Sequence, residues 1–447
     1  MKILHYSLGF PPFRTGGLTK FCTDLMVQQA REGNEVSLIW PGEIGILNKT
    51  TSIKNSGVKI INESRICSYR IKNPLPIPYD EGIGNVEPFI NEGDEGVYLR
   101  FLEEFKPDVL HIHTFMGLHK NFLTAAKKLN IHIVFSAHDF FPICPKVTLF
   151  KNGGICENAN NCDECSVCNA SALSMKKMII LQSRIYRILK DTAIVKKLRK
   201  QHRDAYLADE DCKISEINFS DYFQLKRYYQ MMMNLIDVIH YNSTLTKEIY
   251  EKYLGKRKSK VISISHGDIS DNRRLKEVKD DCINVRYLGA QSRAKGYFYL
   301  KKSINNLKGN KNKLVLHIHF QPEKSEKYMR VHHRYTYSEL EQIFENTDVL
   351  IMPSICYETY GYVVLEALSY GVPVIISNNV GAKDIIVENA GIVFDSKNQY
   401  ALTHVLEQIN ADMLMEMNRV ICEKQPIITM EKMARQIEKD CYGWTIA

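Results

Sequence analysis

Two glutamates separated by seven residues, Glu358 and Glu366, are the side chains whose type and spacing point most directly to chemistry. Glu358 follows the short apolar run Val349–Pro353, and Glu366 lies in the helical pattern of Gly361–Tyr370. A strand that leads into a helix in this way places polar side chains at the carboxyl end of a parallel sheet, where helix N–H groups bind phosphate. Carboxylates at that edge are well placed to accept hydrogen bonds from sugar hydroxyls on either side of a diphosphate.

A second ligand-binding pattern occurs at the start of the chain. The loop 9–17 ends in Gly16 and Gly17 and joins a predicted strand, Lys2–Ser7, to a predicted helix, Leu18–Glu32. A glycine pair at such a crossing lets the backbone approach a ligand and places N–H donors at the helix start. An ordinary turn is the alternative interpretation.

Histidines mark the ends of two further predicted strands. Alternation along residues 107–113 puts His111 and His113 on one side, and it places His113 at the crevice end of the strand. His138 follows the predicted strand Ile131–Ala137. We expect His138 to donate a hydrogen bond to a sugar hydroxyl or to developing charge. A structural histidine with satisfied hydrogen bonds is the competing interpretation for His113 and His138.

Five of the twelve cysteines fall within 25 residues, in the pattern C-x11-C-x5-C-x2-C-x2-C. They are Cys144, Cys156, Cys162, Cys165 and Cys168. Thiolates two residues apart bend readily around a tetrahedral Zn²⁺, and four of the five would suffice for a structural zinc site. Free thiols and redox or iron–sulfur chemistry stay open as alternatives.

Composition sets the broad class. The chain has 447 residues, 45% hydrophobic and 25% charged, which fits a soluble protein of two domains. No apolar run approaches the roughly 18 residues that span a bilayer, and we expect a cytoplasmic protein. The net charge of +8 favours anionic partners, without separating nucleotide, lipid and nucleic acid.

The positive charge is concentrated in one segment. Residues 176–203 carry ten Lys and Arg against one acidic residue, with apolar residues near a 3.6 period. This pattern predicts a basic amphipathic helix that lies on the anionic inner face of a membrane, as in a peripheral protein. A solvated helix packed on its own domain is the alternative.

The elements that position these residues alternate as strand and helix, which predicts an α/β fold. We place an N-terminal domain at 1–270 and a C-terminal domain at 271–447, with an insertion at about 142–235 that holds the cysteines and the basic helix. Residues 42–100 are poorly patterned, and only Val58–Ile61 reads as a strand there.

The unit around the two glutamates, continued by Leu-Ser-Tyr-Gly-Val-Pro-Val-Ile and then Val380-Gly381-Ala382, resembles the donor-site signature of the family 4 glycosyltransferases of the GT-B fold. Landmarks in matching order extend the resemblance over most of the chain except roughly residues 142–235. It implies two Rossmann-like, doubly wound domains that face a cleft. The first would bind the acceptor and the second the nucleotide sugar, and the last helix would cross back to the first.

The resemblance also implies roles for residues of the second domain. Glu358 would contact the transferred sugar, Glu366 the ribose, and backbone N–H groups near Gly361 the phosphates. Family members carry an Arg and a Lys for the diphosphate in the loop that corresponds to 289–296; Lys295 matches, whereas Ala290 replaces the Arg. We expect Arg293 to supply the missing cation.

In the first domain, the resemblance implies that Gly16 and Gly17 face the donor phosphate and the acceptor. It places His138 beside the donor sugar, which makes His138, Glu358 and Lys295 the expected catalytic group. His113 is expected on the acceptor side.

The predicted function is therefore transfer of a hexose from a nucleoside diphosphate sugar to a hydroxyl acceptor, with retention and without a catalytic metal. The basic segment favours a lipid-linked saccharide of surface polysaccharide synthesis as acceptor. Another GT-B chemistry such as sugar-nucleotide epimerisation is an alternative. So is nucleic-acid binding by the cysteine cluster and the basic helix, although the basic segment lacks interleaved aromatic residues apart from Tyr186.

Overall fold

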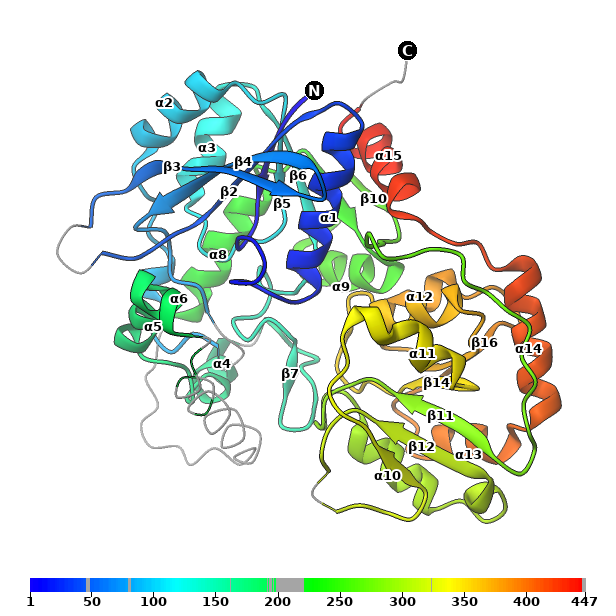
Figure 1. Cartoon of the computed structure of the whole chain (residues 1–447). Helices are drawn as coiled ribbons and strands as arrows, with labels where there is room; N and C mark the ends of the chain where they lie inside the picture. Colours follow the sequence, from blue (N-terminus) through cyan, green and yellow to red (C-terminus); the bar gives the residue numbers. More distant parts are fainter. Residues whose placement is uncertain are drawn as a thin grey trace.

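Short runs of mostly apolar residues form the strands of two separate sheets, each covered by helices, as the computed structural model shows (Figure 1). The structure describes residues 1–45, 49–78, 82–160, 162–190, 192, 195, 197, 221–322 and 324–443. The architecture is the predicted α/β fold with two doubly wound domains. No helix within these described ranges combines the length and apolarity needed to cross a membrane.

The first sheet has eight strands in the order β10-β9-β6-β5-β1-β2-β4-β3, and every neighbouring pair is parallel except β3 with β4. Its strands are β1 (Lys2–Tyr6), β2 (Glu35–Pro41), β3 (Ser52–Ile61), β4 (Ser64–Lys72), β5 (Val109–Ile112), β6 (His132–Ala137), β9 (Val238–Tyr241) and β10 (Ser259–Val261). The helices of this domain include α1 (Gly17–Arg31), α2 (Glu95–Phe105), α3 (Lys120–Lys128) and α9 (Thr244–Leu254). The strand order reverses between β1 and β5, so ligands are expected beyond the carboxyl ends of these two strands.

The antiparallel edge of this sheet was not predicted beyond one short strand. Asn62 and Glu63, with φ of 45° and 69°, form the tight turn that joins β3 to β4. The side chains of β4 alternate between buried and less buried faces in its first half. The sequence signal is weak because β3 is an edge strand, most of whose residues stay at least partly exposed.

The second sheet has six parallel strands in the order β13-β12-β11-β14-β15-β16. They are β11 (Ile283–Tyr287), β12 (Leu314–Ile318), β13 (Met329–Val331), β14 (Val349–Met352), β15 (Val374–Ser377) and β16 (Gly391–Phe394). Its helices include α10 (Tyr297–Asn305), α11 (Leu340–Glu345), α12 (Tyr362–Ser369), α13 (Ala401–Gln408) and α14 (Ala411–Lys424). In chain order this is the 3-2-1-4-5-6 arrangement of dinucleotide-binding folds, whose ligand crevice opens between the first and fourth strands, here β11 and β14.

The segment between β6 and β9 holds short elements. They are β7 (Phe150–Lys151), β8 (Gly154–Ile155), α4 (Cys162–Cys168), α5 (Met175–Gln182), α6 (Arg184–Leu189) and α8 (Tyr222–Met233). The predicted continuous helix over 176–203 is wrong, because Ser183 has an extended backbone, ends α5 and caps α6 by accepting a hydrogen bond from the Tyr186 N–H at 3.1 Å. Most of the predicted helix beyond residue 190 lies outside the described residues.

The last helix, α15 (Met430–Cys441), lies against the first domain beside α1 (Figure 1). Asn34 donates a hydrogen bond to the Glu438 carboxylate at 3.1 Å, and Gln29 donates one to the Tyr442 hydroxyl at 3.1 Å. One hydrophobic cluster joins Phe21 of α1 with Leu350 of β14, so the two domains share part of their core.

Candidate functional site

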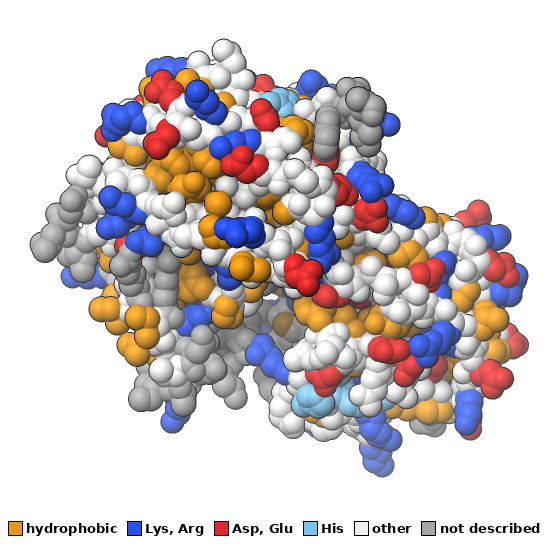
Figure 2. Space-filling model, turned by 45° about the horizontal axis from the view of Figure 1, so that its top comes forward, with side chains coloured by type: hydrophobic (Ala, Val, Ile, Leu, Met, Phe, Trp, Pro, Cys, Tyr) orange, Lys and Arg blue, Asp and Glu red, His pale blue; other side chains and the backbone are white. Residues whose placement is uncertain are grey.

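A cavity of about 290 Å³ opens at the crevice of the second sheet. The ends of β11 and β14 and the start of α12 line it, together with the loops that follow the two strands. Its lining comprises Tyr287, Leu288, Gly289, Ala290, Lys295, Tyr335, Tyr337, Leu350, Ile351, Met352, Ser354, Glu358, Gly361, Tyr362, Val363 and Glu366. Four residues predicted from the sequence thus share one cavity: Lys295, Glu358, Gly361 and Glu366. The surface between the two halves of the molecule is hollowed (Figure 2).

The loop 289–296 sets Lys295 against Glu358. The Ala294 carbonyl accepts hydrogen bonds from the backbone N–H groups of residues 355 and 356, at 2.9 and 3.0 Å, which ties this loop to the one after β14. Gly296 is required here because its φ is 74° and a Cβ would lie 1.8 Å from the Pro353 carbonyl oxygen. Lys295 Nζ consequently lies 2.5 Å from Glu358 Oε1.

Glu366 is buried, with only 3% of its surface exposed. Its Oε1 atom lies 3.1 Å from His266 Nε2, and the Asp268 backbone N–H lies 3.3 Å from His266 Nδ1. Because Nδ1 accepts from the backbone, Nε2 carries the proton and donates to the carboxylate. Glu366 is therefore held by a residue of the first domain, and a solvated position at a helix end is excluded.

The N-terminus of α12 meets the glycine loop of the first domain. Gly361 precedes this helix with φ 105°, and a Cβ there would lie 3.0 Å from Val380 Cγ1. Across the cleft, a Cβ on Gly17 would lie 3.4 Å from the Tyr362 ring, and Gly16 caps α1 with φ 109°. The structure thus places the two predicted glycines beside the helix start that lines the cavity.

His138 lies next to the same loop without lining the cavity. Its carbonyl oxygen accepts a hydrogen bond from the Thr359 hydroxyl at 3.0 Å, and Thr359 directly follows Glu358. The His138 ring packs on Phe21 with a centroid distance of 4.5 Å. His138 therefore belongs to the first-domain side of the cleft.

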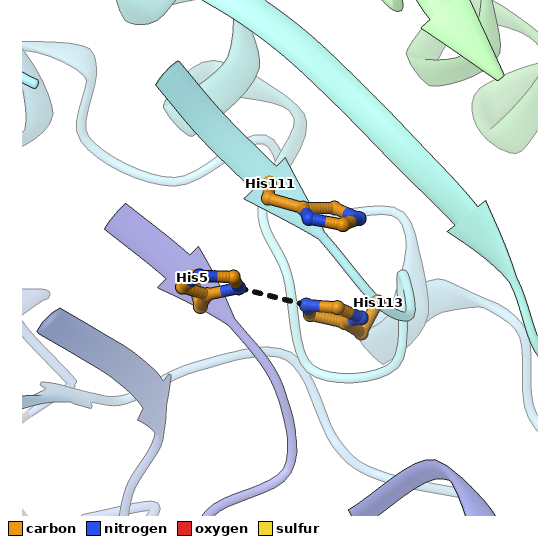
Figure 3. A group of neighbouring side chains, drawn as sticks. All are labelled: His5, His111 and His113. Atoms are coloured by element: carbon orange, nitrogen blue, oxygen red, sulfur yellow. Dashed lines mark hydrogen bonds between the residues drawn. The ribbon is translucent and has the colours of Figure 1, made fainter. Parts of the chain in front are cut away.

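Behind His138, histidines from the reversal point of the first sheet form a buried cluster (Figure 3). His5 of β1 pairs in register with His111 of β5, and His113 follows β5. The three side chains are fully buried, and their ligand atoms all lie within 4.8 Å of one another. Every ring nitrogen of the three has a hydrogen-bond partner in the structure, so a metal ion here would have to break existing bonds.

The order of protons in this network follows from its far end. His240 Nε2 lies 2.8 Å from the Ile262 carbonyl oxygen, which only accepts, so Nε2 carries the proton of a neutral ring. His240 Nδ1 then accepts from the Ser136 hydroxyl at 2.7 Å. The Ser136 oxygen in turn accepts from His111 Nε2 at 2.7 Å, which leaves His111 Nδ1 to accept from the Tyr442 hydroxyl at 2.6 Å.

The hydrogen-bond directions from Tyr442 to the cleft are assigned in the same way. The Tyr442 oxygen accepts from the Gln29 amide, and Gln29 Oε1 accepts from His5 Nε2 at 2.8 Å. His5 Nδ1 accepts from His113 Nε2 at 2.9 Å, and His113 Nδ1 accepts from His138 Nε2 at 3.3 Å. Neutral His138 is left with Nδ1 as an acceptor. In this tautomer Nδ1 accepts hydrogen bonds and does not donate them.

Burial keeps these rings neutral. It lowers the pKa of His5 and of His240 to about 4 and that of His138 to about 3. Burial, reinforced by the neighbouring rings, also holds the pKa of His111 and of His113 well below the ordinary value. The tautomers derived above are therefore those present at neutral pH.

Two predicted positions differ from expectation. Arg293 is exposed and absent from the cavity lining; it lies near the β7–β8 hairpin, where a Cβ on Gly153 would be 3.7 Å from the Arg293 guanidinium. His113 has no exposed surface, so it contacts His138 rather than an acceptor directly. As for the clustered cysteines, four of the five line a second, smaller cavity that shares no lining residue with the first.

Sequence reasoning missed several residues of the site. Tyr335 and Tyr337 line the cavity. His266 contacts Glu366, and Tyr442 contacts His111 of the buried histidine cluster; both come from distant segments of the chain. His266 stood in a recognisable turn before the domain boundary. Nothing local marks Tyr442.

Comparison with known proteins identifies two family models in the chain. Residues 15–155 match "Glycosyltransferase Family 4", and residues 268–424 match "Glycosyl transferases group 1". A curated relative, an uncharacterized 41.2 kDa protein in the cps region of Klebsiella pneumoniae, is 36% identical over 114 residues. That match covers 25% of this chain and 32% of the relative, so the chain matches only about a third of that protein's length.

Solved structures of the same fold cover nearly the whole chain. A glycosyltransferase from Rickettsia africae has a TM-score of 0.57 at 12% identity and covers 98% of this chain and 97% of its own. HepE of Anabaena in complex with UDP gives 0.55 at 12% identity, with 99% and 100% covered. Sucrose-phosphate synthase from Thermosynechococcus elongatus gives 0.54 at 14% identity, with 98% and 97% covered. At such identities the likeness shows the fold alone.

Proposed function

Because the chain belongs to the family 4 glycosyltransferases of the GT-B fold, we propose that it transfers a hexose from a nucleoside diphosphate sugar to a hydroxyl acceptor, with retention of configuration. The observation that carries the proposal is the cavity between β11 and β14. There Lys295, Glu358, Gly361 and Glu366 converge beside the free N–H groups of a helix start. Similar folds hold UDP and UDP-glucose, so a UDP-sugar is the first donor to test.

In this proposal the diphosphate lies between Lys295 and the N-terminus of α12. As the bond from the anomeric carbon to the diphosphate oxygen breaks, negative charge grows on the leaving oxygen, and both groups stabilise it. The acceptor oxygen bonds to the anomeric carbon and passes its proton to the departing phosphate. Glu366 would bind the ribose, Glu358 the transferred sugar, and His138 would accept from a sugar hydroxyl.

Lys295 and Glu358 form an ion pair in the proposed donor site, so the charge of each is balanced before a donor binds. Lys295 is 41% exposed, whereas Glu358 is 15% exposed and also accepts from the Ser354 hydroxyl at 3.1 Å. The lysine is thus the mobile partner and can turn toward an entering phosphate while Ser354 still holds the carboxylate. Charge-assisted contacts of this kind are the strong ones in a partly dry site.

The acceptor in our proposal is a lipid-linked saccharide of surface polysaccharide synthesis. The relative from a cps region supports this assignment. So does the surface of α5 and α6, where Ile180, Ile185 and Ile188 are 60 to 78% exposed and Lys176 and Lys177 are exposed as well. Apolar side chains beside lysines suit an anionic membrane surface.

The membrane part of the proposal is tested with vesicles that contain anionic lipid. Replacement of Lys176 and Lys177 by Gln should weaken sedimentation with the vesicles, since each lysine contributes about 1 kcal/mol near such a surface. The matched control replaces the exposed Lys256 and Lys258 by Gln on the same domain. Equal binding of all three proteins would remove the membrane from the account.

The transfer itself is tested by turnover. We expect UDP release from a UDP-hexose to depend on an added hydroxyl acceptor and to be lost in Glu358→Gln. A new sugar nucleotide formed without acceptor would instead indicate epimerisation. Salt-sensitive RNA binding without any turnover would favour a nucleic-acid-binding protein.

A further inference from the structure

Four thiols surround a small cavity in the segment that follows β6. The cavity has a volume of about 20 Å³, which is the scale of a single ion or water molecule. Its lining comprises Ile143, Cys144, Pro145, Phe150, Lys151, Cys156, Ala159, Glu164, Cys165, Cys168, Asn169 and Lys226. Cys144 and Cys156 are free thiols. Cys162 is the one member of the cluster that does not line this cavity.

The four thiols come from three local structures. Cys165 and Cys168 are three residues apart in α4, so their side chains share one face of that helix. Cys156 directly follows β8, and Cys144 lies in the turn after β6. Three separate chain segments thus bring their thiols to the lining of one cavity, which simple burial of small apolar residues does not require.

The turn around Cys144 directs backbone donors to the sulfur. The N–H groups of Lys146 and Leu149 donate hydrogen bonds to it. Val147 and Leu149 adopt φ of 71° and 52° in this turn. A left-handed conformation is costly for a β-branched residue such as Val, so the rest of the structure must hold it there.

A cation already stands beside the cluster. Lys226 Nζ lies 3.7 Å from Cys165 Sγ. Clustered thiolates need positive charge nearby, and one lysine cannot balance several of them. A divalent ion within the cavity, together with Lys226, would offset three of the four negative charges.

We propose that Cys144, Cys156, Cys165 and Cys168 bind one Zn²⁺ ion as a structural site, with Cys162 outside the ligand set. Binding forms four Zn–S bonds and releases the proton of each thiol that was protonated. Among the described residues, the group whose ligand atoms already lie within 4.8 Å of one another is His5, His111 and His113, so no three of the four sulfurs lie that close. The cysteine side chains must therefore rotate inward around the ion. The histidine nitrogens are not available to it, because they are engaged in the hydrogen-bond network described above.

The test is metal analysis of the full-length protein, purified without added metal or chelator, by mass spectrometry. We expect about one zinc per chain in the wild type and in Cys162→Ser. Each of the variants Cys144→Ser, Cys156→Ser, Cys165→Ser and Cys168→Ser should lose most of it. The variant Cys67→Ser, which removes an exposed thiol elsewhere, is the control for an effect of any cysteine substitution.

Because a ligand variant could fail to fold, release is also measured on the wild type. Titration of the thiols with a mercurial reagent should liberate zinc to a colorimetric chelator, and removal of the metal should lower Tm. A wild-type protein without bound metal would overturn the proposal. So would zinc loss in Cys162→Ser with retention in one of the other four, or a broad absorption near 400 nm with bound iron.

Discussion

The substitution Tyr442→Phe tests whether the buried hydrogen-bond network has the order derived from the structure. The Tyr442 hydroxyl donates to His111 Nδ1 at 2.6 Å and accepts from Gln29 Nε2 at 3.1 Å. Phe keeps the ring, so little packing is lost. However, His111 Nδ1 loses its hydrogen-bond donor, and the Gln29 amide N–H loses its acceptor. Each is fully buried, and an unsatisfied buried polar group costs about 1–3 kcal/mol.

The free energy of unfolding should therefore fall by about 2–6 kcal/mol. For domains of this size that corresponds to a decrease in Tm of at least about 4 °C, which differential scanning calorimetry resolves. Tyr400→Phe is the matched control, because Tyr400 is 63% exposed. If Tyr442→Phe melts with Tyr400→Phe and the wild type, the network does not hold α15 to the first domain, and the assigned tautomers lose their basis.

Two further outcomes follow from the site and its protonation. Lys295→Met should weaken binding of UDP about ten- to a hundredfold by calorimetry, because it removes a charge-assisted contact of about 1.5–3 kcal/mol; unchanged affinity would place the diphosphate elsewhere. The free energy of unfolding should decrease as the pH drops from about 6.5 toward 4. In this range the histidines bind protons in the unfolded chain but stay neutral in the folded one, as for His5, whose pKa burial lowers to about 4. The slope reaches up to about 1.4 kcal/mol per pH unit for each such histidine, whereas Asp139 and Glu438, whose pKa burial raises to about 6 and about 7, act in the opposite direction. Because five histidines of the network outnumber these two carboxyls, urea midpoints should decrease between pH 6.5 and pH 5, and a constant or rising midpoint would contradict the assignment.

The sequence predicted that Lys295, Glu358, Gly361 and Glu366 lie close together because order along the chain determines position at a parallel sheet. Lys295 lies in the loop that follows β11, Glu358 and Gly361 lie in the loop that follows β14, and the carboxyl ends of neighbouring strands meet at one edge. The sheet order then brings these residues together without any information on side chains. Glu366 is positioned by the helix that begins at the same edge.

Residues that act across the domains were not predictable in this way. Tyr442 meets His111 over a separation of 331 residues, and His266 meets Glu366 over 100. These contacts depend on the path of α15 back to the first domain and on the path of the linker between the two domains. No local sequence pattern determines either path. Arg293 was misplaced for a related reason, because the conformation of its loop depends on contacts with the loop after β14, at Pro353 and at residues 355 and 356.

The segment 176–203 shows the limit of periodicity. Its apolar spacing suggested one helix, but Ser183 can cap a helix with its own hydroxyl and thereby begins a new one. Likewise α14 was overlooked, since its pattern is interrupted by the polar Asn418, which is buried and hydrogen-bonded to the Gly371 carbonyl at 2.7 Å.

The central claim is that the cavity between β11 and β14 holds the nucleotide of the donor, and calorimetric titration with UDP and its sugars tests it most directly. In Glu366→Gln the amide oxygen can still accept a hydrogen bond from His266, so this variant should fold. It lacks the negative charge that would bind the ribose hydroxyls. The account predicts binding to the wild type and to the exposed-site control Glu416→Gln, and affinity about tenfold or more lower for Glu366→Gln. Equal affinity of Glu366→Gln and the wild type would contradict it.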